Sequence, residues 1–500
     1  MPRLGIVDLG SNNARMVVYE YRAGRWFRLV DDISEPIRLG EGLGASGRLT
    51  RRAIGRGFAA LTLFADYAAA AGLDELVLLG TSALRDAANA ELLHRAIEPR
   101  GLRIEVLSGE EEARLGVLAV ANSFAHADAW VMDLGGGSAQ ISHMSDRAYA
   151  GGEAHPLGAV RLTEAHLHND PPRRSQVRAL EKVVAAELEP LARALGRSDA
   201  PLIAMGGTIR NLARAVQEAA GYPLALLHGY FLKRRDLEDF TDRLLALSAR
   251  RRAALAGLNP ERADILVAGA LVYRWLLQAA GRDGLYVSGQ GLREGVFYRR
   301  FLPAPHQLED VRAFAVANLA SRFSLATAHT RHVRELAGQL FTGLAPIHGL
   351  GPREAELLAA AAALHDIGIT VGFYRHHRHG GYILEADALP GFSHREHALL
   401  IELIRFHHKG IPRLDRFRPL TLASDKEMLG RLATCLRLAE SLERSRAQRI
   451  RSVRVELDER TVRLRLEARE EPAVEIWEAE QHAGLVRRAF GRKLVIESGG

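Results

Sequence analysis

Cysteine and long apolar runs are scarce in this sequence, and each shortage excludes certain classes of protein. Cys435 is the single cysteine among 500 residues, which excludes an intrachain disulfide framework and any metal site built from several thiolates. No uninterrupted apolar run reaches the ~18 residues that a membrane-spanning helix requires. The first ten residues carry Asp8 within their apolar stretch, unlike a signal peptide. We therefore expect a cytoplasmic protein with no membrane partner, in which Cys435 is buried in a helix.

Lysine supplies only five of the 67 basic residues, which leaves 62 arginines. Against 60 acidic residues the formal net charge is +7, and a basic protein suits an anionic partner. An arginine excess in a chain rich in alanine and leucine also reflects genomic base composition, and we favour this interpretation. The charge therefore does not identify the partner.

The composition is that of a folded protein, with 47% apolar and 25% charged residues. Short apolar segments alternate with amphipathic stretches over the first third of the chain, which indicates an α/β fold. Helices are expected at 51–71 and 110–122. The segments with the character of strands are 4–10, 16–21, 75–80, 103–107 and 130–135.

The length predicts two to four domains, and changes of pattern suggest where they divide. Long helices dominate from about residue 173 to 300, and a proline-containing stretch at 299–307 is a candidate linker. A His-rich helical region follows, and an alternating pattern at 453–467 predicts a β-hairpin. The limits that we predict are 1–125 and 126–302 for two α/β lobes, 308–447 for an all-α domain and 448–500 for a small α+β domain.

One short motif occurs twice, 125 residues apart. Residues 8–13 read DLGSNN and residues 133–138 read DLGGGS, and each copy follows one apolar strand and precedes another. The aspartate at the strand end can hold a hard cation, and the glycines let backbone amides surround a phosphate. A single DLG turn is more typical of an Asx-turned hairpin. Two copies at this spacing predict two related lobes that face each other across a phosphate-binding cleft.

Three consecutive glutamates open the expected helix at 110–122. Ser108 and Glu111 have the spacing of a capping box, and Glu110 suits the positive end of the helix dipole. These structural roles leave Glu112, which lies on the apolar face and should be buried on most sides. A carboxylate at the buried mouth of a helix beside a phosphate cleft is a candidate for polarising an attacking water.

Two further strand ends carry residues that suit phosphate. Arg85 follows the strand at 75–80 and presents a planar fork of donors, although a surface ion pair is the more usual role of one arginine among 62. Gly206, Gly207 and Thr208 lie between an apolar strand and a helix, where backbone amides can bind a phosphate or ribose. A plain strand-to-helix turn explains that segment equally well.

Seven segments, in this order, resemble the exopolyphosphatase and guanosine pentaphosphate phosphohydrolase family. They are GIVDLGSNNARMVVY, TSALRDAANA, VLSGEEEARLGV, VMDLGGGSAQIS, AMGGTIRNLA, GLNPERADILVAGALVY and VSGQGLREGVFY. The resemblance covers residues 4–300 almost continuously. That family belongs to the actin, hexokinase and Hsp70-like ATPase-fold superfamily, which agrees with the repeated DLG turns. The resemblance therefore implies two ribonuclease-H-like (actin-like) lobes, followed by the all-α domain.

The resemblance also implies a function, namely an exopolyphosphatase that removes terminal orthophosphate from inorganic polyphosphate with Mg²⁺ or Mn²⁺. By this likeness Glu112 orients or deprotonates the water and Arg85 grips the terminal phosphate. Asp133, together with Asp8, would serve the metal. Guanosine penta- or tetraphosphate is a further implied partner, nucleic acid is not expected, and a homodimer is. The residues implied to line the phosphate path are Gly10, Ser11, Asn12, Asn13, Gly135, Gly136, Gly137, Ser138, Gly206, Gly207 and Thr208.

The second DLG turn departs from the family pattern. Where many members read Gly-Gly-Ser-Thr-Glu, this chain has Gly137, Ser138, Ala139 and Gln140 after two glycines. A hard dication prefers anionic oxygen ligands. The neutral amide of Gln140 therefore leaves the composition of the metal-ligand set open.

The helical region carries histidines in the order of an HD-type phosphohydrolase, and the resemblance extends to it because longer family members append an HD-like domain. The longer side chain of Glu440, in place of the usual last aspartate, argues against a complete metal site. We favour a helical scaffold that grips the chain over a second active site. His376, His377 and His408 are interpreted as surface groups or as supports for ligands. The candidate ligands are His332, His365, Asp366, His379, His407 and Glu440.

Four functions stay open at this point, with a processive exopolyphosphatase favoured. Hydrolysis of the 5′-terminal phosphate of guanosine pentaphosphate needs the same terminal phosphoryl group, so the motifs do not separate it from the first. A nucleotide-gated sensor without turnover is disfavoured by Glu112. An HD hydrolase with an inactive front half would depend on Asp366 rather than on Glu112.

Overall fold

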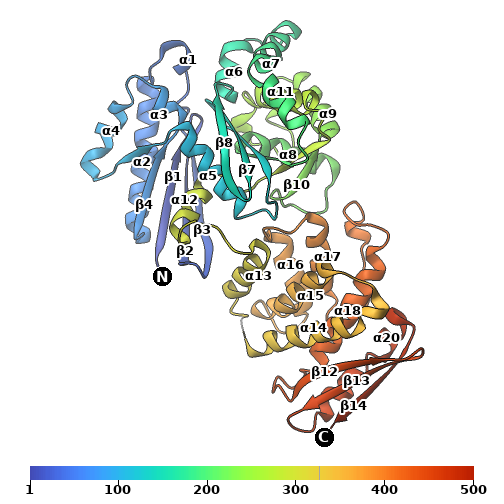
Figure 1. The fold of residues 1–500 in the computed structure, drawn as a ribbon. Coiled ribbons are helices and arrows are strands. Elements are labelled where there is room, and N and C mark those ends of the chain that lie inside the picture. The colour runs from blue at the N-terminus through green and yellow to red at the C-terminus, as the bar shows by residue number, and fades with distance from the viewer. Residues whose placement is uncertain (326, 500) are drawn as a thin grey trace. The chain divides into compact units, whose positions relative to one another are not determined.

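The computed structural model describes residues 1–325 and 327–499. The chain forms two compact units, Met1–Val311 and Arg312–Gly500, which are considered one at a time (Figure 1). Within the described residues, no helix combines the length and the apolar character that crossing a membrane would take.

The first half of the first unit is built on a five-stranded sheet with the order β3-β2-β1-β4-β5. β1 pairs antiparallel with β2, and β2 with β3, whereas β4 and β5 run parallel to β1. Helices pack beside this sheet (Figure 1). The strands are β1 (Arg3–Leu9), β2 (Asn13–Arg22), β3 (Trp26–Pro36), β4 (Glu75–Gly80) and β5 (Ile104–Val106), and the helices are α1 (Leu43–Ser46), α2 (Arg51–Ala71), α3 (Ser82–Asp86) and α4 (Glu91–Ile97).

The second half of this unit repeats the same topology. Its sheet has the order β10-β11-β9-β6-β7-β8, with β6, β7 and β8 antiparallel and β9 and β11 continuing in parallel from β6. Only the edge strand β10 is additional. The strands are β6 (Ala129–Leu134), β7 (Ala139–Ser145), β8 (Ala148–His155), β9 (Leu202–Met205), β10 (Tyr230–Lys233) and β11 (Gly284–Val287). The prediction of two ribonuclease-H-like (actin-like) lobes is confirmed.

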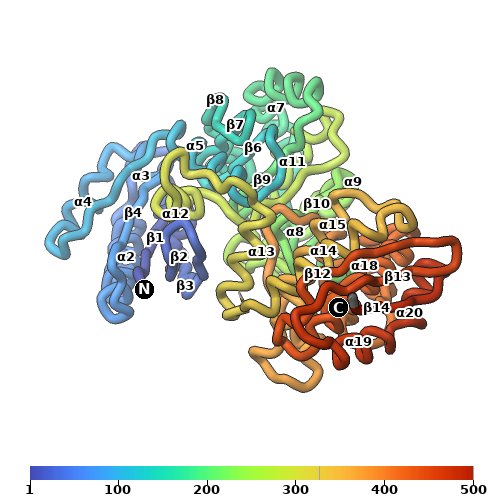
Figure 2. The backbone as a smooth tube through the Cα atoms, turned by 60° about the horizontal axis from the view of Figure 1, so that its bottom comes forward, coloured from blue at the N-terminus to red at the C-terminus, as the bar shows by residue number. Residues whose placement is uncertain are grey.

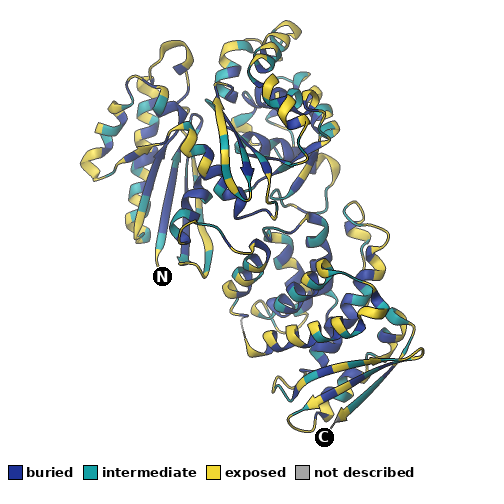
Figure 3. Ribbon diagram, viewed as in Figure 1, coloured by how far each residue is buried: buried dark blue, intermediate teal, exposed yellow. Residues whose placement is uncertain are grey.

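Helices surround the second sheet, and all of those named below except the short α10 share a large apolar core with it. Figure 3 shows the central strands buried and the outward faces of the helices exposed. These helices are α6 (Ala159–His166), α7 (Arg174–Gly196), α8 (Gly207–Ala220), α9 (Arg234–Leu245), α10 (Ala249–Arg252) and α11 (Leu266–Ala279).

The sequence pattern found most of the central strands and missed the outer strands β3, β8 and β10. β3 and β8 carry mostly half-buried or exposed residues, and β8 also contains Gly151 and Gly152. Strands at the outer side of a sheet bury few side chains, so their sequences lack the apolar run by which the central strands were recognised.

Two helices connect the lobes. α5 (Gly109–Ala121) packs against α12 (Leu292–Phe301), and α12 returns from the second lobe to lie beside β1 and β2 of the first (Figures 1 and 2). Phe297 of α12 stacks on Tyr19 with ring centroids 4.2 Å apart. The helices approach closely at Gly295, where a Cβ atom would lie 2.0 Å from the carbonyl oxygen of Leu115.

The second unit is helical and ends in a small sheet. β12 and β13 form an antiparallel hairpin, which confirms the hairpin predicted at 453–467, and β14 adds in parallel. Cys435 is buried in α18, as expected, and burial raises the pKa of its thiol to about 12. The elements are α13 (Val311–Arg322), α14 (Ala328–His348), α15 (Pro352–Leu364), α16 (His376–Ala386), α17 (His394–Arg405), α18 (Asp425–Ser441), β12 (Ile450–Leu457), β13 (Thr461–Ala468), α19 (Ala473–Glu480), α20 (Ala483–Phe490) and β14 (Lys493–Gly499).

We predict that Gly295→Ala destabilises the first unit by about 1–3 kcal/mol, because the added methyl group overlaps a backbone carbonyl that cannot move aside. Thermal unfolding followed by circular dichroism measures the change. The control is Gly55→Ala in α2, where a Cβ atom meets open space in the described part of the chain. There alanine should stabilise the helix by up to ~1 kcal/mol. Equal effects of the two substitutions would contradict the close α5–α12 packing.

Candidate active site

The two DLG turns have the same local geometry and lie against each other. The Gly10 amide donates to the carbonyl of Asn13 at 3.0 Å, and the Gly135 amide donates to the carbonyl of Ser138 at 3.0 Å. A Cβ atom on Gly137 would lie 2.8 Å from Ser11 Oγ. The structure therefore brings the loop of one lobe into contact with the loop of the other, and glycine permits this approach.

Small residues surround this contact. Ser11 Oγ lies 3.1 Å from Ser82 Oγ, and a Cβ atom on Gly136 would lie 2.9 Å from Ser11 Cβ. A small hollow at this position is lined by residues of both turns together with Arg161. Arg161 donates to the carbonyl of Gly137 at 2.9 Å and to Asp86 at 2.6 Å.

Three carboxylates lie close enough to influence one another's protonation. Burial raises the pKa of Glu112 to about 7, Arg85 opposes this shift, and repulsion from Asp133 and Asp8 adds to it. Burial also raises the pKa of Asp133 to about 6, with Arg210 opposing and Asp8 adding. The pKa of Asp8 is raised by burial as well, against the opposing charge of Arg293. Because each carboxylate repels the others, the three belong to one site.

Glu112 is oriented by its own helix and by two side chains. The predicted capping box is present, since Glu111 N donates to Ser108 Oγ at 3.1 Å and Ser108 N donates to Glu111 Oε2 at 2.9 Å. The Glu112 side chain is only 12% exposed. Arg85 forms an ion pair with one of its oxygens, and Gln140 Nε2 donates to the other at 3.3 Å.

The structure gives Arg85 and Gln140 specific positions beside this carboxylate. Arg85 also donates to the carbonyl of Leu107 at 2.8 Å, so its guanidinium is fixed against Glu112, and its role as a phosphate ligand stays a prediction. Gln140 also donates to Ser138 Oγ at 2.8 Å. A carboxylate at position 140 could not donate either hydrogen bond.

The third turn approaches the same carboxylates. Gly206 precedes α8 with a φ of 96°, and a Cβ atom there would lie 2.6 Å from Asp133 Oδ1. Thr208 is buried in the first turn of α8. The segment 206–208 therefore places the amides of a helix N-terminus beside Asp133, where they can bind an anion.

Sequence reasoning missed three arginines that lie at this site. Arg293 donates to Asp8 Oδ2 at 3.3 Å, Arg262 donates to Asn13 at 3.2 Å, and Arg210 donates to the carbonyl of Gly289 at 2.8 Å. Burial lowers the pKa of Arg210 to about 10, and repulsion from Arg293 and Arg15 adds to this shift. Each lies inside a segment that carries the family resemblance, but one arginine among 62 has no local feature that marks it.

The carboxylates fit a divalent cation. Asp8 Oδ1 is buried without a hydrogen-bond partner among the described residues, and Asp133 adds further carboxylate oxygens. Hard cations such as Mg²⁺ and Mn²⁺ take such ligands. The amide of Gln140 donates to Ser138 and Glu112, so the anionic ligands of such a cation would come from the aspartates.

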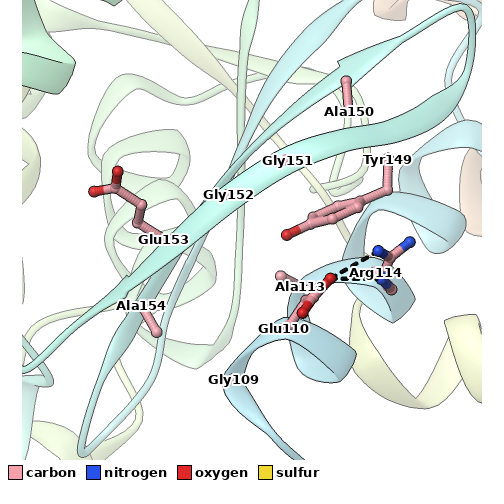
Figure 4. Close-up of a pocket in the computed structure, with 10 residues that line it drawn as sticks. All are labelled: Gly109, Glu110, Ala113, Arg114, Tyr149, Ala150, Gly151, Gly152, Glu153 and Ala154. Atoms are coloured by element: carbon pink, nitrogen blue, oxygen red, sulfur yellow. Dashed lines mark hydrogen bonds and ion pairs between the residues drawn. The ribbon is translucent and has the colours of Figure 1, made fainter.

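A pocket of about 720 Å³ adjoins the first turn of α5, the turn that carries Glu112 (Figure 4). Tyr149 of β8 forms one wall, and the guanidinium of Arg114 lies 4.4 Å from the centre of its ring. Glu110 accepts a hydrogen bond from Arg114 at 2.7 Å. Glu110 is therefore engaged in the wall of this pocket, in contrast to Glu112, whose side chain is largely enclosed.

The second unit holds a separate cluster of histidines around Asp366. Two groups of possible ligand atoms share this aspartate, and within each group the atoms lie within 4.8 Å of one another. The first group is His329, His365 and Asp366. The second is Asp366, His376 and His407. Of the candidate ligands from the sequence, His365, Asp366 and His407 lie in these groups. Glu440 lies beside them, with an oxygen 4.0 Å from His407 Nε2. Burial raises the pKa of Glu440 to about 7.

The two groups differ from the predicted ligand set by one helical turn at two positions, and the ligand roles remain predictions. His329 takes the place predicted for His332, and His376, interpreted as a surface group, takes the place predicted for His379. Residues three apart share a helix face, so the spacing could not decide between them. His332 Nε2 is instead hydrogen-bonded to the carbonyl of Ile450 at 2.7 Å. His377 and His408 lie outside both groups.

Two family profiles match the sequence of this chain. The profile of the Ppx/GppA phosphatase family matches residues 17–303, and that of Ppx/GppA phosphatase domain III matches residues 311–477. The chain belongs to the Ppx/GppA phosphatase family. The family is one of hydrolases, and the match covers the second DLG turn at 133–138, whereas the first, at 8–13, lies before the start of the match.

Named relatives and solved structures agree with this assignment. Exopolyphosphatase 2 of Mycobacterium tuberculosis is 32% identical over 314 residues, which are 59% of this chain and 98% of the relative. Exopolyphosphatase 1 of Mycobacterium bovis is 33% identical over 310 residues, or 60% and 88%. The crystal structure of an exopolyphosphatase from Cytophaga hutchinsonii has a TM-score of 0.56 at 25% identity and covers 60% of this chain and 97% of its own. A Ppx/GppA family member from Aquifex aeolicus has a TM-score of 0.51 at 26% identity and covers 59% and 96%.

We predict that Gln140→Glu moves the rising limb of the pH profile for phosphate release upward by roughly one pH unit or more. Glu112 must lose its proton to accept another, and its pKa is about 7, so activity should rise as the pH passes that value. A second carboxylate beside Glu112 disfavours the charged form and raises its pKa further. Steady-state rates between pH 5 and 9 measure the shift.

The control for this prediction is Gln140→Met, which removes the hydrogen bond without adding a charge. Its rising limb should stay near that of the unaltered protein. The interpretation of Gln140 as a neighbour that keeps Glu112 ionisable is wrong if both variants shift alike, or if Gln140→Glu leaves the profile in place.

Proposed function

We propose that the first unit is an exopolyphosphatase that releases terminal orthophosphate from inorganic polyphosphate by metal-assisted attack of water. The observation that carries this proposal is the position of Glu112. Its carboxylate is largely enclosed, has a pKa of about 7 and is electrostatically coupled to Asp8 and Asp133, the two aspartates that lead into the DLG turns. A base with this pKa can accept a proton near neutral pH.

Glu112 has the surroundings of a general base. In the proposed step the oxygen of a water attacks the terminal phosphorus while Glu112 accepts the water's proton. The bond between that phosphorus and the bridging oxygen breaks, which leaves orthophosphate and a chain one phosphate shorter. Arg85 and Gln140 support this step by fixing the direction of the carboxylate.

Charge neutralisation is the other requirement of phosphoryl transfer. Arg210, Arg262 and Arg293 are held near one another against their mutual repulsion, an arrangement that suits a polyanion. The amides of the three glycine turns add further donors at the same place. Asp8 and Asp133 would hold Mg²⁺, which when bound neutralises charge on the transferring phosphoryl oxygens.

We predict that Glu112→Gln lowers the rate of orthophosphate release by about 10²–10⁴-fold while polyphosphate still binds. The amide keeps the shape of the side chain but cannot accept the proton. Release is measured with a colorimetric phosphate assay, and binding by equilibrium titration with labelled polyphosphate.

Glu111→Gln is the matched control, because Glu111 is the exposed neighbour on the same helix turn and retains its capping role as glutamine. Its rate should remain within a few-fold of the unaltered protein. Near-normal release by Glu112→Gln, or an equal loss in Glu111→Gln, would remove Glu112 from the chemical step.

The identity of the substrate is a separate question, because guanosine pentaphosphate ends in the same phosphoryl group. We expect polyphosphate to be the better substrate, as the named relatives at 32–33% identity are exopolyphosphatases. Competition between the two substrates on one preparation compares their kcat/KM values directly. A higher value for guanosine pentaphosphate would assign the same site to alarmone hydrolysis instead.

A further inference from the structure

The histidines around Asp366 in the second unit come from four places in the sequence and converge on one carboxylate. His329 lies in α14, His365 follows α15, His376 begins α16 and His407 follows α17. His365 Nε2 and His376 Nε2 each lie 3.6 Å from Asp366 Oδ1, and His329 Nε2 lies 3.7 Å from Oδ2. The side chain of Asp366 is only 5% exposed.

Hydrogen bonds fix the orientation of three of these rings. The Nδ1 atoms of His365, His376 and His407 lie 2.8, 3.0 and 2.7 Å from the backbone carbonyls three residues earlier in the chain. A carbonyl oxygen only accepts, so each Nδ1 carries the hydrogen. In a neutral imidazole the lone pair is then on Nε2, the atom that faces Asp366. This orientation of a ring by a backbone carbonyl is typical of metal-binding histidines.

Two of these lone pairs face each other. His376 Nε2 and His407 Nε2 are 2.9 Å apart, which is unfavourable for two acceptors unless a cation lies between them. Two ligand nitrogens that each lie ~2.1 Å from one ion, with a right angle between the two bonds, are ~3.0 Å apart. A proton would fill the gap only by creating an imidazolium against His407, whose side chain is fully buried.

The other group has unsatisfied nitrogen atoms. Both ring nitrogens of His329 and Nε2 of His365 are buried and lack a hydrogen-bond partner in the described ranges 1–325 and 327–499. Buried polar atoms are nearly always satisfied in folded proteins, so such atoms point to a missing partner. Glu443, whose side chain is 1% exposed, lies 3.8 Å from His329 Nδ1 and adds a carboxylate at this end.

Both guanidinium and carboxyl groups adjoin the rings. Arg446 donates to Asp366 Oδ2 at 2.7 Å, but its side chain is 54% exposed. Asp366, Glu440 and Glu443 place three carboxyl groups at or beside the rings. An exposed guanidinium can rotate away into the solvent, and the carboxylates are then free to bind a cation.

We propose that the two groups, which share Asp366, bind two divalent transition-metal ions, with Asp366 bridging them. Imidazole-rich sets with one carboxylate suit Mn²⁺, Fe²⁺ or Zn²⁺ better than Mg²⁺. The site is built from residues of the second unit alone and is independent of the function proposed for the first. It replaces the interpretation of this domain as a scaffold without metal.

The experiment counts metal ions in the full-length protein. The chain is stripped with a chelator, dialysed against Zn²⁺ or Mn²⁺ in excess Mg²⁺, and analysed by inductively coupled plasma mass spectrometry. The thermal unfolding midpoint before and after loading is a second measurement that does not depend on activity. We expect His376→Ala to lose one ion per chain and Asp366→Asn to lose two, with a corresponding loss of the metal-induced rise in midpoint.

His379→Ala is the matched control, because it removes a histidine from the same helix, one turn beyond His376. It should keep the metal content of the unaltered protein, and ions bound by the first unit contribute equally to every variant. Equal metal content in His376→Ala, His379→Ala and the unaltered protein would overturn the proposal. The same holds if Asp366→Asn, folded by circular dichroism, loses no ion. His376 is partly exposed, so its substitution should not prevent folding.

Discussion

Repulsion among three largely enclosed carboxylates is the constraint on which the first unit depends. Raising the pKa of Glu112 from 4.5 to about 7 means that its charged form is disfavoured by about 3 kcal/mol. Asp8 and Asp133 experience the same burial and repel Glu112 and each other. Such an arrangement is costly for folding, and sites of this kind are concentrated where proteins perform chemistry.

The fold makes this arrangement tolerable by bringing cations from distant parts of the chain. Arg210 comes from α8 of the second lobe and opposes the charge of Asp133. Arg293 comes from α12, which returns to the first lobe and so reaches Asp8. Arg85, between β4 and α4, holds Glu112. The close packing of α12 on α5 at Gly295 is therefore also a condition for charge balance at the site, since it fixes the helix that carries Arg293.

The sequence predicted those features that are local or repeated. The DLG turns predicted two lobes because each copy lies at a strand end and leads into a hairpin, and the topology repeats as expected. The capping box left Glu112 as the buried member of three glutamates by elimination, and its side chain is indeed enclosed. The site roles assigned to these residues remain predictions, but their proximity is a property of the fold.

Features that depend on long-range convergence were not accessible in the same way. Arg262 and Arg293 reach the first lobe across more than 240 positions, and no spacing rule relates them to it. The sequence named His332 and His379, whereas the groups around Asp366 contain His329 and His376, one helical turn away, because the choice depends on which ring lies at the level of Asp366. Local chemistry can therefore be read from the sequence, whereas the partner of a side chain cannot.

The two units differ in the donor atoms that they offer, and this difference has a physical consequence. Asp8 and Asp133 present oxygen only, within reach of several guanidinium groups, so the cation proposed there would be a hard ion such as Mg²⁺. The rings around Asp366 present nitrogen lone pairs fixed by backbone carbonyls, which hold borderline-soft ions firmly. If both proposed sites are occupied, the two units of one chain would therefore differ in the metals that they prefer, because they differ in ligand type.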